Sequence, residues 1–261
     1  MLDREELASV SALFGVSEDQ VVKDHLISHV LHALARSGQP VTFFGGTALH
    51  RRHFPSPETG GRLSEDIDLC ALDRRPVAEA LDGELPRLLR REFPGSAWDP
   101  GLARVAASAP ASLVTGDGVR VRIQLLAFAD HRDYLKLPTE VRPVEMRYRD
   151  VPATELNVPT LAAFAAMKTC AWIDRRAARD LYDLAALARR GALNADAAAL
   201  VNEVIGYPVA PHFFDRVGDL NWQRELAHQM PALPPMRTCL AGVRAAYGDT
   251  LGWEQRGDAL G

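Results

Sequence analysis

The sequence has few cysteines and no long apolar run. Cys70, Cys170 and Cys239 are widely spaced and odd in number, so neither a disulfide framework nor a CxxC metal site is predicted, and reduced thiols in the cytosol are favoured. No apolar stretch approaches the ~18 residues that a membrane span requires, and the charged start of the chain is not typical of a signal peptide. We therefore expect a cytoplasmic protein without membrane association.

An excess of positive charge and several common enzyme signatures are also missing. The formal net charge is −4 at pH 7, which argues against a uniformly basic nucleic-acid-binding surface but permits a local basic groove. There is no Walker A motif, dinucleotide-binding fingerprint or Gly-x-Ser-x-Gly motif. The histidines show no metal-ligand spacing, since His50 and His53 could share a helical face but further donors are not evident.

The order of apolar and breaking residues predicts an α+β fold. The 261 residues, 47% of them hydrophobic, suffice for one large domain or two modest ones. Residues 1–36 have mostly helical spacing and stop at residues 37–40. The elements expected next are a strand at 41–44, a helix at 48–52, a strand within 62–72, a helix at 77–93 interrupted near Gly83 and Pro86, a hairpin at 111–128 and an extended segment at 141–149. We expect a mixed sheet with flanking helices over residues 1–154 and a helical half over residues 155–261.

The most informative segment runs from Arg62 to Leu69. In a strand, Asp66 and Asp68 project from one face while Ile67 points into the core. Two neighbouring carboxylates repel each other unless a cation lies between them, and hard oxygen donors suit Mg²⁺. Two such ions can activate an attacking oxygen and stabilise a leaving pyrophosphate. Taken alone, so short a pattern is more typical of a solvent-facing edge strand or a turn with incidental acids.

A glycine turn upstream favours the functional interpretation. Gly45, Gly46 and Thr47 follow a short apolar strand and open a helix, where free N–H groups and the lack of a side chain allow close approach of phosphate. Thr47 adds a hydroxyl group. Ser64, on the same face as Asp66, offers a contact to phosphate or to a metal-bound water. Together these residues predict a phosphate-binding turn that faces a metal site.

These segments resemble the AbiEii/MenT-type nucleotidyltransferase toxins of bacterial toxin–antitoxin systems, a branch of the polymerase-β-like nucleotidyltransferases. The resemblance rests on residues 44–49 and 62–69, on Lys168 in the helix after residues 158–161, and on the basic-Asp-x-x-Asp segment 179–184. It implies a metal-dependent enzyme (Mg²⁺ or Mn²⁺) that transfers a nucleoside monophosphate from an NTP and releases pyrophosphate. It further implies an RNA acceptor, the 3′ end of tRNA, and a cognate antitoxin protein.

The resemblance also implies roles for residues in the helical half. Lys168 is a candidate to neutralise the triphosphate, although a lysine beside an apolar stripe also snorkels to solvent without any function. Asp180 or Asp183 would orient Lys168 or activate the acceptor hydroxyl, but an acid in the first turn of a helix is favoured by the helix dipole alone. The sequence departs from the family pattern at Gln124, where a third acid often stands.

Arginines form two clusters despite the acidic total. The first holds Arg74, Arg75, Arg87, Arg90 and Arg91, and the second Arg175, Arg176 and Arg179. Such runs are usually solvated faces, but in one groove they would hold an RNA backbone.

Our hypothesis is an RNA-modifying nucleotidyltransferase toxin with Asp66 and Asp68 as metal ligands. One alternative is the same chemistry on a small molecule or protein. The other is a catalytically weak binding protein, which Gln124 suggests because glutamine is a poor ligand for a second ion.

Overall fold

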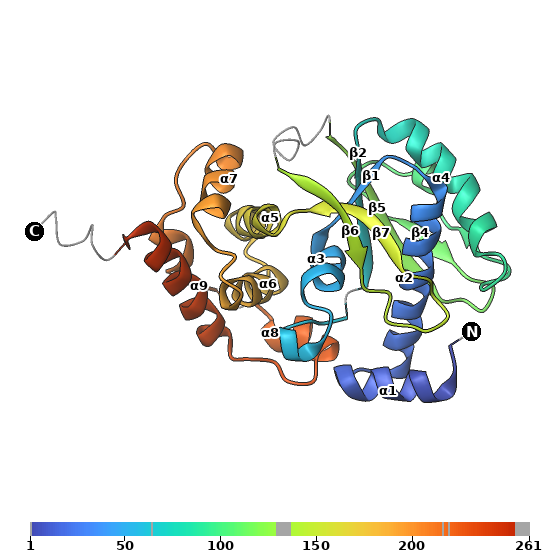
Figure 1. Cartoon of the computed structure of the whole chain (residues 1–261), viewed down its shortest axis with the longest axis horizontal. Helices are drawn as coiled ribbons and strands as arrows, with labels where there is room; N and C mark the ends of the chain where they lie inside the picture. Colours follow the sequence, from blue (N-terminus) through green and yellow to red (C-terminus); the bar gives the residue numbers. More distant parts are fainter. Residues whose placement is uncertain (1, 64, 129–136, 216, 219, 254–261) are drawn as a thin grey trace, which may run out of the picture. The chain divides into compact units, whose positions relative to one another are not determined.

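The computed structural model describes residues 2–63, 65–128, 137–215, 217–218 and 220–253. Their contacts form two compact units (Figure 1). The first holds the described residues up to 128, with Thr139–Val158 and Gln229–Pro231; the second holds residues 137–138, the described part of Pro159–His228, and the described residues from Ala232 on. The domain boundary predicted from the sequence, between residues 154 and 155, falls within the strand Thr154–Pro159. This boundary stays a prediction.

The first unit begins with two helices where the sequence predicts helix. α1 (Arg4–Phe14) ends at Gly15, which adopts the left-handed conformation (φ +63°), and Ser17 caps the start of α2 (Glu18–Ser37) through its side-chain oxygen. Gly38, also left-handed, ends α2 where the sequence places the stop. The break between the two helices was not expected.

A five-stranded mixed sheet follows, in the order β1-β2-β5-β4-β3. Its strands are β1 (Val41–Phe44), β2 (Asp66–Ala71), β3 (Ala97–Trp98), β4 (Ala111–Val114) and β5 (Arg120–Ala127). β2 is parallel to β5 and antiparallel to β1. The turn before β5 includes Gly118, whose φ of +90° suits glycine. The predicted strand at 41–44 and the predicted hairpin are confirmed.

Helices cover this sheet and complete the first core. α3 (Gly45–His53) contacts β1 and β2, while α2 and α4 (Arg74–Leu89) pack on each other and on β5. The apolar residues of β2 and β5 that alternate with polar ones are buried, as the alternation predicts; they include Ile67, Leu69, Val121, Ile123 and Leu125. Short 3₁₀ turns lie at Pro57–Thr59 and Leu102–Arg104.

Two details differ from the sequence prediction. α4 is continuous through Pro86 and ends at Leu89, so the expected interruption was wrong. The buried row Leu81, Leu85 and Leu89 holds the helix together despite the N–H group that proline lacks. The chain beyond residue 154 does not start as helix, because β7 (Thr154–Pro159) first pairs with β6 (Thr139–Val144) as a two-stranded sheet.

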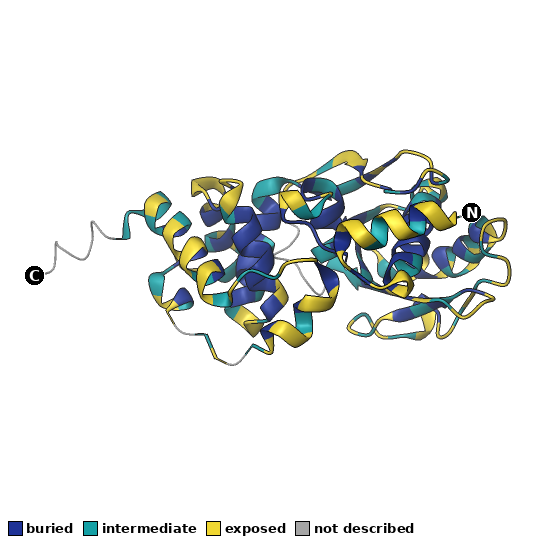
Figure 2. Cartoon of the chain, turned by 90° about the horizontal axis from the view of Figure 1, so that it is seen from below, coloured by how far each residue is buried: buried dark blue, intermediate teal, exposed yellow. Residues whose placement is uncertain are grey.

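The second unit is helical, as expected. It contains α5 (Leu161–Arg175), α6 (Ala178–Arg189), α7 (Ala195–Ile205), α8 (Trp222–Leu226) and α9 (Met236–Leu251), with a 3₁₀ turn at Pro211–Phe214. A further 3₁₀ turn, Ala227–Gln229, ends at the first residue of the short segment that belongs to the first unit. α6 contacts α5, α8 and α9, so it lies at the centre of this unit. Buried and exposed residues alternate along these helices (Figure 2), which is typical of amphipathic helices around a core.

The predicted fold class, a mixed sheet with flanking helices followed by a helical half, is confirmed. Among the described residues, no helix is both long and apolar enough to cross a membrane.

Candidate active site

Asp66 and Asp68 lie on the same face of β2. Both are partly exposed, whereas Ile67 and Leu69 between and after them are buried, so the strand geometry predicted from the sequence is confirmed. Asp68 is the register partner of Phe44 on β1 and of Gln124 on β5. The two carboxylates therefore lie on an inner strand of the sheet, and Asp68 is next to the point where β1 passes into α3.

The start of α3 is packed against Asp68. Gly45 has a φ of +76°, and a Cβ atom added to it would lie 2.1 Å from Asp68 Oδ2. A side chain at this position would therefore displace the carboxylate, which explains why glycine is required. Gly46 follows in the first turn, and no side-chain cap hydrogen bond is made at this helix start. The first turn of α3 thus lies directly beside the Asp68 carboxylate.

Asp66 is held by an arginine that the sequence analysis did not single out. Arg122 is its register partner on the parallel strand β5, and the guanidinium donates through Nε at 2.8 Å and through Nη2 at 2.9 Å to the two carboxylate oxygens. The hydrogen bond and the charge of Asp66 raise the pKa of Arg122 further. The signal was present: if Gln124 lies opposite Asp68, period-2 alternation places Arg122 opposite Asp66.

A cavity of about 570 Å³ adjoins this ion pair. Asp66 and Arg122 line it, and its other charged groups are Asp19, Lys23, Glu65, Asp117 and Arg120. Lys23 Nζ contacts Glu65 Oε2 at 3.3 Å. The cavity thus combines acids, which attract a divalent cation, with three basic side chains, which attract phosphate.

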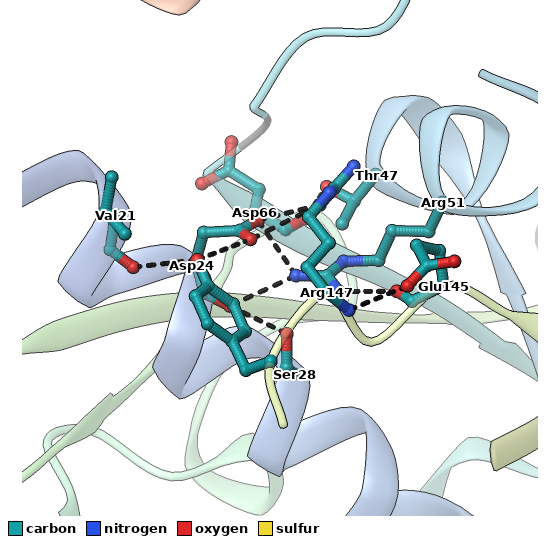
Figure 3. Close-up of polar contacts among 9 residues, drawn as sticks. Val21, Asp24, Ser28, Thr47, Arg51, Asp66, Glu145 and Arg147 are labelled. Carbon is teal, nitrogen blue, oxygen red and sulfur yellow. Dashed lines mark hydrogen bonds and ion pairs between the residues drawn. The ribbon is translucent and has the colours of Figure 1, made fainter. Parts of the chain in front are cut away.

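Thr47 joins α3 to the start of β2. Its side chain is buried, and its hydroxyl donates to the carbonyl oxygen of Asp66 (Figure 3). This contact fixes the distance between the glycine turn and the carboxylate strand. The predicted contact of Thr47 with phosphate stays a prediction, as does that of Gly45 and Gly46. Ser64 lies outside the described residues.

One turn after Thr47, Arg51 anchors α3 in a buried charged cluster (Figure 3). Its guanidinium donates through Nη2 to Asp24 Oδ1 on α2 at 2.8 Å and through Nη1 to the carbonyl oxygen of Glu145 at 2.7 Å. Arg147 donates to Asp24 Oδ1 at 3.0 Å, and the Tyr148 hydroxyl donates to Asp24 Oδ2 at the same distance.

The electrostatics of this cluster favour its charged form. Burial would raise the pKa of Asp24, but Arg147 and Arg51 together hold it below its ordinary value. Burial lowers the pKa of Arg51 to about 10, so its guanidinium remains charged at neutral pH. α3 is therefore tied to α2 and to the segment after β6 by charge-assisted hydrogen bonds.

The position expected for a third acid holds Gln124. Its register opposite Asp68 agrees with the alignment made from the sequence. Its side-chain amide donates to the carbonyl oxygen of Ala107 at 3.3 Å. An amide in this place adds no negative charge, and metal binding by Asp66 and Asp68 stays a prediction.

Lys168, Asp180 and Asp183 form a cluster of their own in the second unit. Lys168 Nζ on α5 lies 2.6 Å from Asp183 Oδ2 and 3.3 Å from Asp180 Oδ1 on α6, and all three residues are buried. Arg175 also binds Asp180 through two hydrogen bonds, at 2.7 and 3.0 Å. Asp180 stands in the first turn of α6, as predicted. The cluster joins α5 to α6, and any role in catalysis stays a prediction.

The two arginine clusters differ in exposure. Arg74 is structural, because its guanidinium donates to the carbonyl oxygens of Leu125, Leu102 and Val105. The exposed members are Arg75, Arg87, Arg90 and Arg91 in the first unit and Arg175, Arg176 and Arg179 in the second.

The expectation that histidines form no metal-ligand arrangement was wrong. His25, His29 and Asp150 bring their ligand atoms within 4.8 Å of one another. The expectation considered His50 and His53 and overlooked the i,i+4 pair on α2, whose third partner is distant in sequence.

Comparison with known families gives the class of protein, which is a nucleotidyltransferase. A family model for the nucleotidyl transferase AbiEii toxin of type IV toxin–antitoxin systems matches residues 29–248, and the chain belongs to this family. Among curated proteins, none matches the chain.

Solved structures share the fold over nearly the whole chain. MenT4, a nucleotidyltransferase toxin from Mycobacterium tuberculosis H37Rv, is 20% identical, with a TM-score of 0.69 over 95% of this chain and 89% of its own. A putative nucleotidyltransferase from H. pylori is 16% identical, with a TM-score of 0.56 over 92% of this chain and 98% of its own. JHP933 from Helicobacter pylori is 16% identical, with a TM-score of 0.53 over 94% of this chain and 99% of its own.

Replacing Gly45 tests whether the close contact with Asp68 matters. Gly45→Ala is expected to lower nucleotidyl transfer at least about 100-fold, because the new methyl group displaces the carboxylate by an ångström or more. Gly38→Ala is the matched control, since Gly38 has a similar φ of +66° with nothing within 4 Å of its added Cβ. Transfer rates and melting temperatures of both variants separate backbone strain from displacement. Equal activity of the two variants would contradict the assignment.

Removing the charge of Asp24 tests the anchor of α3. Asp24→Asn leaves two buried guanidinium groups without a counter-charge, which costs roughly 3–5 kcal/mol and lowers the melting temperature by about 10 °C. Glu79→Gln is the control, because it breaks the exposed ion pair of Arg75 and Glu79. It is expected to change the melting temperature by less than about 2 °C. Thermal unfolding followed by circular dichroism measures both. An Asp24→Asn variant that melts with the wild type would show that the cluster does not hold this unit.

Proposed function

We propose that the chain transfers a nucleoside monophosphate from an NTP to RNA, at the 3′ acceptor end of tRNA, and releases pyrophosphate. Membership of the AbiEii toxin family supports a nucleotidyltransferase with an NTP substrate and a cognate antitoxin. The observation that carries the proposal is the contact of Gly45 with Asp68, because it joins a carboxylate strand to a helix start without a side chain between them.

The carboxylates of Asp66 and Asp68 would hold Mg²⁺ or Mn²⁺, and their hard oxygen atoms fit such an ion. When bound, the ion would neutralise the triphosphate and the leaving pyrophosphate. Gly45 and Gly46 would present backbone N–H groups to the phosphates. Arg122 already compensates the charge of Asp66, and with Lys23 it offers positive charge to a triphosphate in the adjoining cavity.

Residues of the second unit would neutralise the triphosphate and serve the acceptor. Lys168, with Asp180 and Asp183, would complete the site, with Asp180 orienting the lysine or taking a proton from the acceptor hydroxyl. Arg176 and Arg179 are exposed beside this cluster, and they suit the backbone of a polyanionic acceptor. Transfer to a small molecule or a protein is the alternative that uses the same carboxylates.

Labelled nucleotides separate these acceptors. The purified chain, incubated with each α-labelled NTP, Mg²⁺ and total RNA, is expected to label an RNA of tRNA size. Asp68→Asn should lower labelling at least about 1,000-fold, because it removes a ligand of the metal on which the chemistry depends. Asp73→Asn is the control, an exposed acid just after the same strand. Label found only on protein or on small solutes would contradict the RNA acceptor.

The same variants address the binding-protein alternative that Gln124 raises. Expressed without its antitoxin, the wild-type chain and Asp73→Asn should arrest growth, whereas Asp68→Asn should not. Full growth inhibition by Asp68→Asn would show that toxicity does not depend on catalysis.

Salt and arginine substitution test the acceptor surface. The double variant Arg176→Ala, Arg179→Ala is expected to raise KM for RNA about 10-fold and to reduce its salt dependence, because two phosphate contacts are lost. KM for the NTP should not change. Arg224→Ala with Arg237→Ala serves as control, since these arginines are also exposed but belong to neither arginine cluster. An unchanged KM for RNA would remove these arginines from the acceptor site.

A further inference from the structure

Three side chains that commonly bind metal ions converge in the first unit, apart from the aspartates of β2. His25 and His29 lie one turn apart on α2, and Asp150 lies between β6 and β7. Both imidazoles are buried, with 6% of each side chain exposed, and the Asp150 side chain is 21% exposed. Each residue points a ligand atom at the other two.

The distances among these atoms match a coordination polyhedron. His25 Nε2 lies 3.2 Å from His29 Nε2 and 3.1 Å from Asp150 Oδ2, and His29 Nε2 lies 3.4 Å from the same oxygen. In tetrahedral zinc sites, with bonds of about 2.0–2.1 Å, ligand atoms are separated by about 3.3–3.4 Å. The three atoms therefore form a nearly equilateral triangle with the size of one face of such a tetrahedron.

Hydrogen bonding alone accounts poorly for this convergence. His25 Nε2 carries at most one hydrogen atom, yet it faces both oxygens of Asp150, at 3.0 and 3.1 Å, and the Nε2 atom of His29. His29 Nε2 also carries at most one hydrogen atom, so two protons at most are shared among three close contacts, and at least one contact has none of its own. A cation placed just above this triangle would attract all three groups at once.

The surroundings suit a bound ion. The rings of Phe93 and Tyr148 pack against His25, and Phe93 also packs against His29, which provides the apolar shell typical of metal sites. His29 and Asp150 line a cavity of about 520 Å³. The cavity gives an ion a way in and leaves space for a water molecule as a further ligand.

We propose that His25, His29 and Asp150 bind a Zn²⁺-class ion, with water as the fourth ligand. Two imidazole nitrogens and one carboxylate favour zinc over magnesium, so this site differs in chemistry from the one proposed at Asp66 and Asp68. The ion would fasten the segment after β6 to α2 and thereby stabilise the first unit. The inference does not depend on the proposed transfer reaction.

Titration of the metal-free protein with Zn²⁺, against a chromophoric chelator, tests the proposal. The wild type is expected to take up one equivalent and to melt at a higher temperature with Zn²⁺ than without it. His29→Asn and Asp150→Asn should each weaken binding at least about 100-fold, since even changes outside the ligand set reach that size. Co²⁺ in place of Zn²⁺ should give the visible absorption of a four-coordinate ion.

Two variants serve as matched controls. His32→Asn alters a histidine of the same helix whose Nδ1 atom pairs with Thr154 Oγ1, and Asp68→Asn alters the other metal site. Both should bind Zn²⁺ as the wild type does, and excess Mg²⁺ should not displace it. Failure of the folded wild type to take up one equivalent would overturn the proposal, whether or not His29→Asn folds. Equal binding by Asp150→Asn and the wild type would overturn it as well.

Discussion

A buried carboxylate that faces two guanidinium groups is the constraint on which the first unit depends. Asp24 is fully enclosed, and leaving it or its partners unpaired there costs several kcal/mol, a large share of the net stability of a domain. Because Arg51 belongs to α3 and Arg147 to the segment after β6, pairing with Asp24 fixes three parts of the chain at once (Figure 3). α3 cannot shift along the sheet without breaking this pair, so its first turn keeps its place against Asp68.

The segment between β6 and β7 is held to α2 by polar side chains rather than by a β-ladder. The cluster around Asp24 binds Arg147, and the next residue of α2, His25, binds Asp150. Directional contacts of this kind allow one arrangement, whereas apolar packing tolerates several. Both contacts lie on the same helix. The segment is thus fixed to α2, and Arg51 joins α2 to the helix that begins at the glycine turn.

The local sequence pattern predicted the strand with the two aspartates and the glycine turn. The contacts that these elements make with distant segments could not be predicted from it. The alternation around Asp66 and Asp68 lies within one strand, and the glycine turn lies within five residues, so both could be read directly. The ion pair of Asp66 with Arg122 forms because β2 and β5 are parallel and place these two residues opposite each other. Neither the strand direction nor the register could be predicted from the local pattern. Asp150 is 125 residues from His25, so the histidine pair offered no visible third partner.

The charges on β5 explain how two acids can share one strand face. Where a third acid often stands, β5 presents neutral Gln124 opposite Asp68, and it presents Arg122 opposite Asp66. The arginine offsets one of the two negative charges, so the mutual repulsion that would destabilise a bare pair is reduced. A cation bound here would then meet fewer carboxylates than in a three-acid site, and it would rely more on phosphate oxygens of the nucleotide. On this argument, a divalent ion at Asp68 would bind weakly until the nucleotide arrived, and metal and NTP would bind cooperatively.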